Sequence, residues 1–213
     1  MKYRLVALDL DGTLLDSSLQ IRRQTIDALH RIRQQGVQVM IVTGRHHTAT
    51  HAYWHQLGLE LPAICCNGTY LYDFRHRRPL AGNPLTRQEA AELLAIFRKH
   101  PVHAMVYVAD AMVCEKDSPH LDGLRRWSAS LPETIRPRLE FVDSFERLIE
   151  ETETIWKFLA ACAVPALAAM ALAAMYPIEN YLNVGSAIAW GIGFLLMIPL
   201  TAMTLVKVHE VAE

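Results

Sequence analysis

The chain has 213 residues, with 21 basic and 22 acidic side chains and a net charge of −1. This length is typical of one large or two small domains, and the near-zero charge provides no basic footprint for nucleic acid. Hydrophobic residues make up 52% of the chain, which excludes a disordered protein. The mean hydropathy of +0.13 is high for a soluble enzyme, so membrane segments have to be considered.

The composition changes after residue 157. Residues 1–157 contain 20 of the 21 basic and 19 of the 22 acidic residues, whereas residues 158–206 contain one charged residue, Glu179. We expect water around the first part, and lipid or an apolar interior around the second. The four cysteines form no Cys-x-x-Cys pair, and no secretory signal precedes Asp9. The first part is therefore predicted to be cytoplasmic, with reduced thiols.

Strand and helix patterns alternate along the first 80 residues. In chain order they predict a strand at residues 4–8, a helix around 21–32, a strand at 37–42, a helix at 46–57 and a strand at 62–66. The first of these strands is a short apolar run that leads into a loop, which is typical of a parallel strand buried on both faces. Residues 1–80 are therefore predicted to form an α/β, Rossmann-like core with a doubly wound sheet.

The pattern changes after residue 80. A capping box at residues 86–89 precedes an apolar helical face. Strand-like segments follow at residues 102–108, 111–114 and 139–142, and a helix is predicted at 144–153. This order predicts an α+β insertion over residues 81–157.

Polar residues follow each predicted strand of the core. Asp9 and Asp11 follow the first strand, Thr43 the second and Asn67 the third. Because ligands bind beyond the carboxyl ends of strands in open α/β sheets, these residues are expected to share a site. Residues two apart on an extended chain point to the same side, so both aspartates are expected to address one ligand. Two carboxylates this close favour Mg²⁺ on one and, on the other, a proton that can be given and taken back.

Several strings of residues carry a family resemblance. Asp-Leu-Asp-Gly-Thr-Leu-Leu at residues 9–15 and Val-Thr-Gly-Arg at 42–45 resemble the first two motifs of the haloacid dehalogenase (HAD) superfamily phosphatases of Cof type. The bacterial pyridoxal phosphate phosphatases of that group are similar over further strings, at residues 41–47, 62–73, 107–113 and 156–158. The resemblance covers residues 1–158.

This resemblance implies a phosphomonoester hydrolase that uses Mg²⁺ and acts on pyridoxal phosphate or a similar small phosphorylated metabolite. Asp9 would be the nucleophile that forms an aspartyl-phosphate, and Asp11 would be the general acid and base. Both would hold Mg²⁺, Asp9 through its side chain and Asp11 through its carbonyl. The residues expected to bind phosphate or substrate are Gly12, Thr43, Gly44, Arg45, His46, Asn67 and Gly68.

The other histidines and the cysteines are interpreted from their spacing and their place in the predicted elements. His47, His51 and His55 recur at helical spacing, which suits either a metal site or a solvated helix face. No acid or cysteine completes a metal site, so the solvated face is favoured. Cys65 and Cys66 end a predicted buried strand and are expected to be packing residues.

The sequence after residue 158 departs from the family pattern. The family would continue with a lysine and a Gly-Asp-x-x-Asn-Asp segment, whereas this part contains one lysine, Lys207, and no aspartate. A transferring phosphoryl group needs cations around it, so turnover is expected to be severely impaired. The uncharged runs at residues 158–176 and 183–206 predict two transmembrane helices, with a cytoplasmic tail at 207–213. The alternative is a buried helical pair.

Three hypotheses follow. The first is a HAD-type phosphatase, and the second is a protein anchored in the inner membrane by residues 158–206, whose HAD half binds phosphate without catalysis. The third is a truncated or frame-shifted chain joined to an unrelated reading frame, because no linker precedes residue 158. An assay of phosphate release tests the first hypothesis. Carbonate extraction of membranes tests the second, and the reading frames of the DNA downstream of the Phe158 codon test the third.

Overall fold

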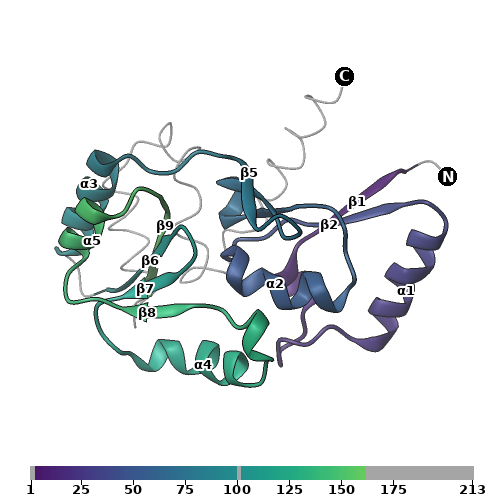
Figure 1. Cartoon of the computed structure of the whole chain (residues 1–213). Coiled ribbons are helices and arrows are strands. Elements are labelled where there is room, and N and C mark those ends of the chain that lie inside the picture. Colours follow the sequence, from purple (N-terminus) through teal and green to yellow (C-terminus); the bar gives the residue numbers. More distant parts are fainter. Residues whose placement is uncertain (1–2, 100–101, 162–213) are drawn as a thin grey trace.

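The computed structural model describes residues 3–99 and 102–161, which form two adjoining lobes (Figure 1). The first lobe contains β1 (Leu5–Leu8), α1 (Arg23–Gln34), β2 (Gln38–Ile41), α2 (His47–Gln56), β3 (Ala63–Cys65), β4 (Tyr70–Asp73) and β5 (Arg78–Gly82). The second lobe, the insertion, contains α3 (Arg87–Phe97), β6 (His103–Val108), β7 (Met112–Cys114), α4 (Asp122–Ala129), β8 (Leu139–Phe141), α5 (Phe145–Glu151) and β9 (Ile155–Ala161).

The first lobe has the predicted α/β alternation. β1 and β2 pair in parallel, and a bridge from Val42 to Ile64 adds β3 in the same direction. Helix α1 connects β1 to β2, and it ends before Gly36, whose φ of +85° suits glycine at a helix C-terminus. β3 then pairs antiparallel with β4, and β4 with β5. The carboxyl ends of β1, β2 and β3 therefore lie at one edge.

Strand β1 is more exposed than predicted. Its residues alternate between exposed and half-buried positions, and Leu5 is 46% exposed. Within residues 3–99 and 102–161, β2 is the one strand paired with β1. The prediction of a fully buried strand at residues 4–8 is therefore wrong. Burial on both faces requires neighbours on both sides of the strand, and the described residues do not provide them.

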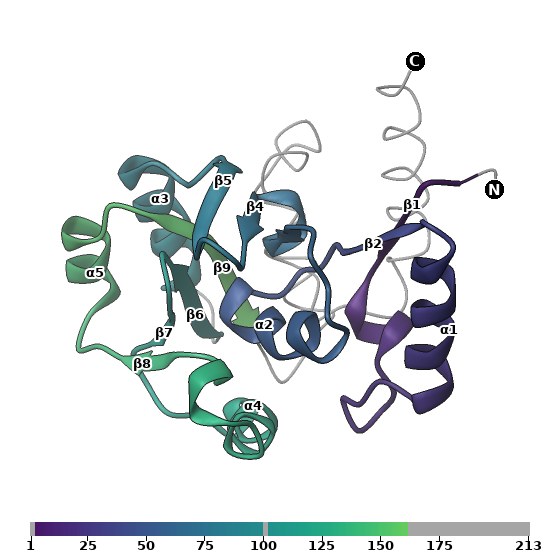
Figure 2. The same cartoon turned by 45° about the vertical axis from the view of Figure 1, so that its right-hand side comes forward.

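The insertion is built on a four-stranded sheet of order β8-β7-β6-β9. Figure 2 shows α3 and α5 on the outer side of this sheet, away from the first lobe. Alternate residues of β6 serve the two faces: Val106 packs with Phe158 in the cluster under α3 and α5, whereas Met105 and Tyr107 belong to the core shared with the first lobe. The predicted capping box is confirmed at the start of α3.

Strand β9 crosses the predicted boundary at residue 157. It pairs antiparallel with β6, from His103 opposite Ala161 to Val108 opposite Ile155. Residues 158–161 are thus a strand, and the prediction of a membrane helix starting at Phe158 is wrong there. An apolar strand packed on both faces has the same composition as the start of a membrane segment, which explains the error.

The other predicted membrane residues, with the tail at 207–213, lie outside the described residues. Among the helices that are described, none has the length and apolar character needed to cross a bilayer. β5 and α4 were not predicted from the sequence. The second residue of α4 is Gly123, a poor helix former, and the helix has only eight residues.

Candidate active site

Two short loops at the ends of β1 and β2, together with the turn after β3, form the candidate site. The first loop (residues 9–14) follows β1, where Asp9 precedes a tight turn at Leu10–Leu14 in which Asp11 and Gly12 have non-helical backbone angles. The turn is closed by the Leu15 N–H, which donates to the Leu10 carbonyl over 2.9 Å. Gly12 adopts φ +73°, a backbone conformation that favours glycine, although a Cβ there would meet no neighbouring atom within 4 Å.

Asp9 is half-buried in this loop. Burial raises the pKa of its carboxyl group, the Leu10 N–H opposes that effect, and the neighbouring Asp11 raises the pKa further. Arg45 acts in the opposite direction, more weakly than either. Additional positive charge near Asp9 would therefore stabilise the ionised form of its carboxyl group.

Arg45 joins the second loop (residues 43–47) to the first. Its Nε donates to Asp11 Oδ2 over 2.7 Å, and its Nη2 donates to Asp11 Oδ1 over 2.6 Å. The guanidinium carbon lies 5.2 Å from the centroid of the Tyr53 ring and 5.3 Å from that of Trp127, beside these two stacked rings. Although burial disfavours its charge, the contacts with Asp11 and Tyr53 raise the pKa of Arg45 overall. Arg45 is thus a buried ion-pair partner, 7% exposed.

Backbone hydrogen bonds hold the second loop against the turn that follows β3. The Thr43 N–H donates to Ile64 O (2.9 Å), and Asn67 N–H donates to Thr43 O (3.0 Å). The Cys66 N–H donates to Arg45 O, also over 3.0 Å. The sequence prediction that Thr43 and Asn67 lie together is therefore confirmed as geometry, and their role toward substrate stays a prediction.

Gly44 is required by this packing. A Cβ at Gly44 would lie 2.2 Å from Asn67 Oδ1, so any larger residue would displace the Asn67 amide. Asn67 and Gly68 both have positive φ, +59° and +96°, which forms the tight turn into β4. Gly44, Asn67 and Gly68 are thus brought together beside Thr43.

His46 has a structural environment that the sequence did not suggest. It caps helix α2, is fully buried, and its Nε2 lies 2.9 Å from the Val108 carbonyl of the insertion. Its Nδ1 lies 2.8 Å from Thr48 Oγ1. Burial, followed by the neighbouring His47, lowers the pKa of His46. Because both ring nitrogens have partners, the predicted substrate contact would require one of them to be exchanged.

The histidine face of α2 is only partly solvated. His47 is buried, stacks on Tyr72 with ring centroids 3.7 Å apart, and faces Asp110 at 3.3 Å. His51 stacks on Phe74 at 5.3 Å, and His55 alone of the three is exposed. The predicted solvated face is wrong for His47, because aromatic residues of β4 cover it. Across residues 3–99 and 102–161, no group of three potential metal ligands occurs.

The two adjacent cysteines pack as predicted. Cys65 and Cys66 are both fully buried. Burial raises the pKa of the Cys66 thiol to about 12, which keeps it protonated and unreactive at neutral pH.

Lys157 was not among the predicted site residues. Its side chain is 2% exposed, and its Nζ donates to the Gly44 carbonyl over 3.1 Å. Burial lowers the pKa of Lys157 to about 8, and Cys66 opposes that shift. The available signal was a lysine between Trp156 and Phe158 in an otherwise apolar strand.

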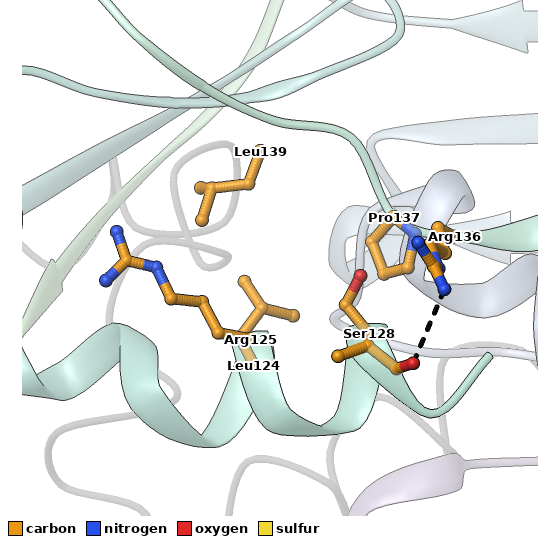
Figure 3. A pocket seen from close by; sticks show the side chains of 7 residues that line it. Leu124, Arg125, Ser128, Arg136, Pro137 and Leu139 are labelled. Carbon is orange, nitrogen blue, oxygen red and sulfur yellow. Dashed lines mark hydrogen bonds between the residues drawn. The ribbon is translucent and has the colours of Figure 1, made fainter. Parts of the chain in front are cut away.

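A surface cavity lies elsewhere, on the insertion. It has a volume of about 220 Å³ and lies between α4 and β8, where Arg125 and Ser128 face Arg136 and Leu139 (Figure 3). None of the predicted site residues lines this cavity. It therefore has no part in the candidate site.

Comparison with known proteins assigns the family. The profile of the haloacid dehalogenase-like hydrolases matches residues 6–175. The chain belongs to this family. The match runs past residue 158, so the resemblance extends further than the motifs alone indicated. The expected HAD fold is confirmed by a solved HAD-like hydrolase from B. subtilis, with a TM-score of 0.66 at 21% identity over 84% of this chain and 67% of that one.

Two curated relatives are phosphatases. The pyridoxal phosphate phosphatase YbhA of Escherichia coli is 41% identical over 158 residues, which cover 74% of this chain and 58% of that protein. The HMP-PP phosphatase of Yersinia pestis is 31% identical over 70% of this chain and 57% of its own length. The chain thus spans less than two thirds of either relative.

Proposed function

We propose that this HAD-family chain hydrolyses small phosphate monoesters, pyridoxal phosphate foremost, through Asp9. The observation that carries the proposal is the bidentate contact of Arg45 with Asp11, which places the second loop directly against the loop that carries Asp9. The 41% identity to a pyridoxal phosphate phosphatase supports the choice of substrate.

The chemistry divides hydrolysis into two steps. The Asp9 carboxylate attacks phosphorus, the bond to the ester oxygen breaks, and Asp11 gives that oxygen a proton. Asp11 then takes a proton from water, which attacks the aspartyl-phosphate, releases phosphate and restores Asp9. Since Arg45 holds both oxygens of Asp11, the acid role requires release of one of them. A dianionic phosphoryl group competing for Arg45 supplies a reason for that release.

The remaining predicted residues fit a phosphate cradle. The Thr43 hydroxyl accepts a hydrogen bond from the Arg45 N–H over 3.2 Å, which leaves its own proton available for a phosphoryl oxygen. Gly12 and Gly68 are exposed at positive φ, where backbone N–H groups can face an anion. Asn67 and Gly44, which lie against each other, are the other proposed members of this cradle.

Mg²⁺ is the proposed cofactor. The half-buried Asp9 carboxylate, whose raised pKa reflects too little compensating charge, and the carbonyl of Asp11 are oxygen donors of the kind that this ion prefers. When bound, Mg²⁺ would neutralise charge on the transferring phosphoryl group. These two donors do not fill its coordination shell, so the low turnover expected from the sequence is part of the proposal.

The test is phosphate release by the purified full chain. We expect Mg²⁺-dependent release from pyridoxal phosphate that exceeds release from HMP-PP, and its loss in Asp9→Asn. Asp16→Asn is the matched control, because Asp16 lies just beyond the first loop and its carboxylate accepts a hydrogen bond from the Ser18 N–H. Release that persists in Asp9→Asn, or no release from either ester, would contradict the proposal.

A membrane anchor is a second proposal, supported only by composition. Residues 162–206 contain a single charged residue, Glu179. If they anchor the chain, carbonate extraction should leave it in the membrane pellet. Complete release into the supernatant would exclude the anchor.

A further inference from the structure

Lys157 is a buried cation without a carboxylate partner among the described residues. Its Nζ donates to Gly44 O and lies 5.7 Å from the centroid of the Tyr107 ring. Burying an ammonium group is costly unless its contacts compensate for lost water. A lysine retained in such a place indicates a specific task for its one hydrogen bond to the first lobe.

That hydrogen bond acts on the peptide group between Gly44 and Arg45. The carbonyl end of this peptide accepts from Lys157, and its N–H end donates to Thr43 Oγ1 over 3.2 Å. The peptide group is planar and rigid, so holding its carbonyl also fixes the direction of its N–H. Lys157 therefore affects the direction from which the Arg45 N–H approaches Thr43 Oγ1. That direction determines which lone pair of the hydroxyl oxygen accepts the N–H, and where the hydroxyl proton points.

We propose that Lys157 is a positioning residue of the phosphate-binding loop: from strand β9 of the insertion it orients the Gly44–Arg45 peptide, and through it the Thr43 hydroxyl. The proposal rests on the proposed function, in which Thr43 donates to a phosphoryl oxygen. It makes the insertion part of the phosphate site, although Lys157 itself does not touch the phosphate.

The surrounding contacts support this coupling. The next three residues of the second loop also meet the insertion: Arg45 contacts the Trp127 ring, His46 the Val108 carbonyl and His47 the Asp110 carboxylate. Those three contacts are made by side chains of the loop. Of the four contacts between the second loop and the insertion, the contact made by Lys157 is the one that acts on the loop backbone.

A double-mutant cycle tests the proposal in the full chain. Lys157→Met keeps the aliphatic volume and removes the donor, and Thr43→Val removes the hydroxyl. We expect Lys157→Met to lower kcat/KM for pyridoxal phosphate about 10-fold, and Thr43→Val about 100-fold, since one positioned donor contributes on that scale. If both act through one hydroxyl, the double variant should match Thr43→Val within about twofold. Effects that multiply would overturn the proposal.

A second measurement does not depend on turnover. Hydrogen exchange of the Arg45 amide reports its bond to Thr43 Oγ1, and Lys157→Met should accelerate it about 10-fold or more. Ile155→Val is the control, because Ile155 is equally buried in β9 and faces the other core cluster. Unchanged Arg45 exchange in Lys157→Met would overturn the positioning role. If exchange responds while the wild type releases no phosphate, the proposed function fails and the positioning role stands.

Discussion

The two loops of the candidate site differ in how they meet their surroundings. The first loop exposes Gly12 and Thr13 and leaves Asp9 half-buried, whereas Thr43, Arg45, His46 and His47 of the second loop are buried. The insertion accounts for much of this difference, because it contacts four consecutive residues of the second loop. The first loop thus presents the proposed reactive groups, and the second is buried against the insertion.

The largest effect is expected in the first loop. Asp11→Asn removes the proposed acid and base, so kcat for phosphate release should fall about 10²- to 10⁴-fold. Steady-state kinetics beside Asp16→Asn measures this. A fall of less than about 10-fold would show that another group transfers the proton.

The support provided by the insertion is tested at Trp127. Trp127 is 7% exposed and stacks on Tyr53, with ring centroids 5.3 Å apart. Trp127→Leu should lower the free energy of unfolding by about 2 kcal/mol, because it leaves a cavity beside Arg45. Urea denaturation followed by circular dichroism gives the value. A loss below about 0.5 kcal/mol would mean that the lobes pack independently of this ring.

The sequence predicted the first loop better than the second. Asp9, Asp11 and Gly12 are adjacent in the chain, so local geometry alone places them, and the βαβ alternation locates them at a strand end. The surroundings of Arg45 and His46 depend on Trp127 and Val108, which are 82 and 62 residues away in the chain. No local pattern encodes such contacts. Lys157 was missed for the same reason, since its partner Gly44 is 113 residues distant.

Acid should lower the free energy of unfolding through His47 of the buried second loop. Burial lowers the pKa of His47 to about 3, well below its ordinary value of 6.5. The unfolded chain then binds one more proton than the folded chain between these values, so stability is complete above pH 6.5 and falls as the pH decreases toward 3. His47→Gln should reduce this slope, and urea midpoints at several pH values would show it. Equal slopes in both proteins would contradict the assignment.

The smallest effect concerns the exposed partner of His47. Asp110 has a side chain that is 65% exposed, so its charge is screened by water. Asp110→Asn should change the free energy of unfolding by less than about 0.5 kcal/mol at pH 7. A larger loss in urea denaturation would show that the contact with Asp110, rather than aromatic packing on Tyr72, holds His47.

We propose above all that the first loop carries the nucleophile. The most direct measurement is mass spectrometry of the full chain after acid quenching during incubation with pyridoxal phosphate and Mg²⁺. We predict one added phosphoryl group on the peptide that contains Asp9, removed by hydroxylamine and absent in Asp9→Asn. Phosphate release without this adduct, or an adduct on another peptide, would contradict the account.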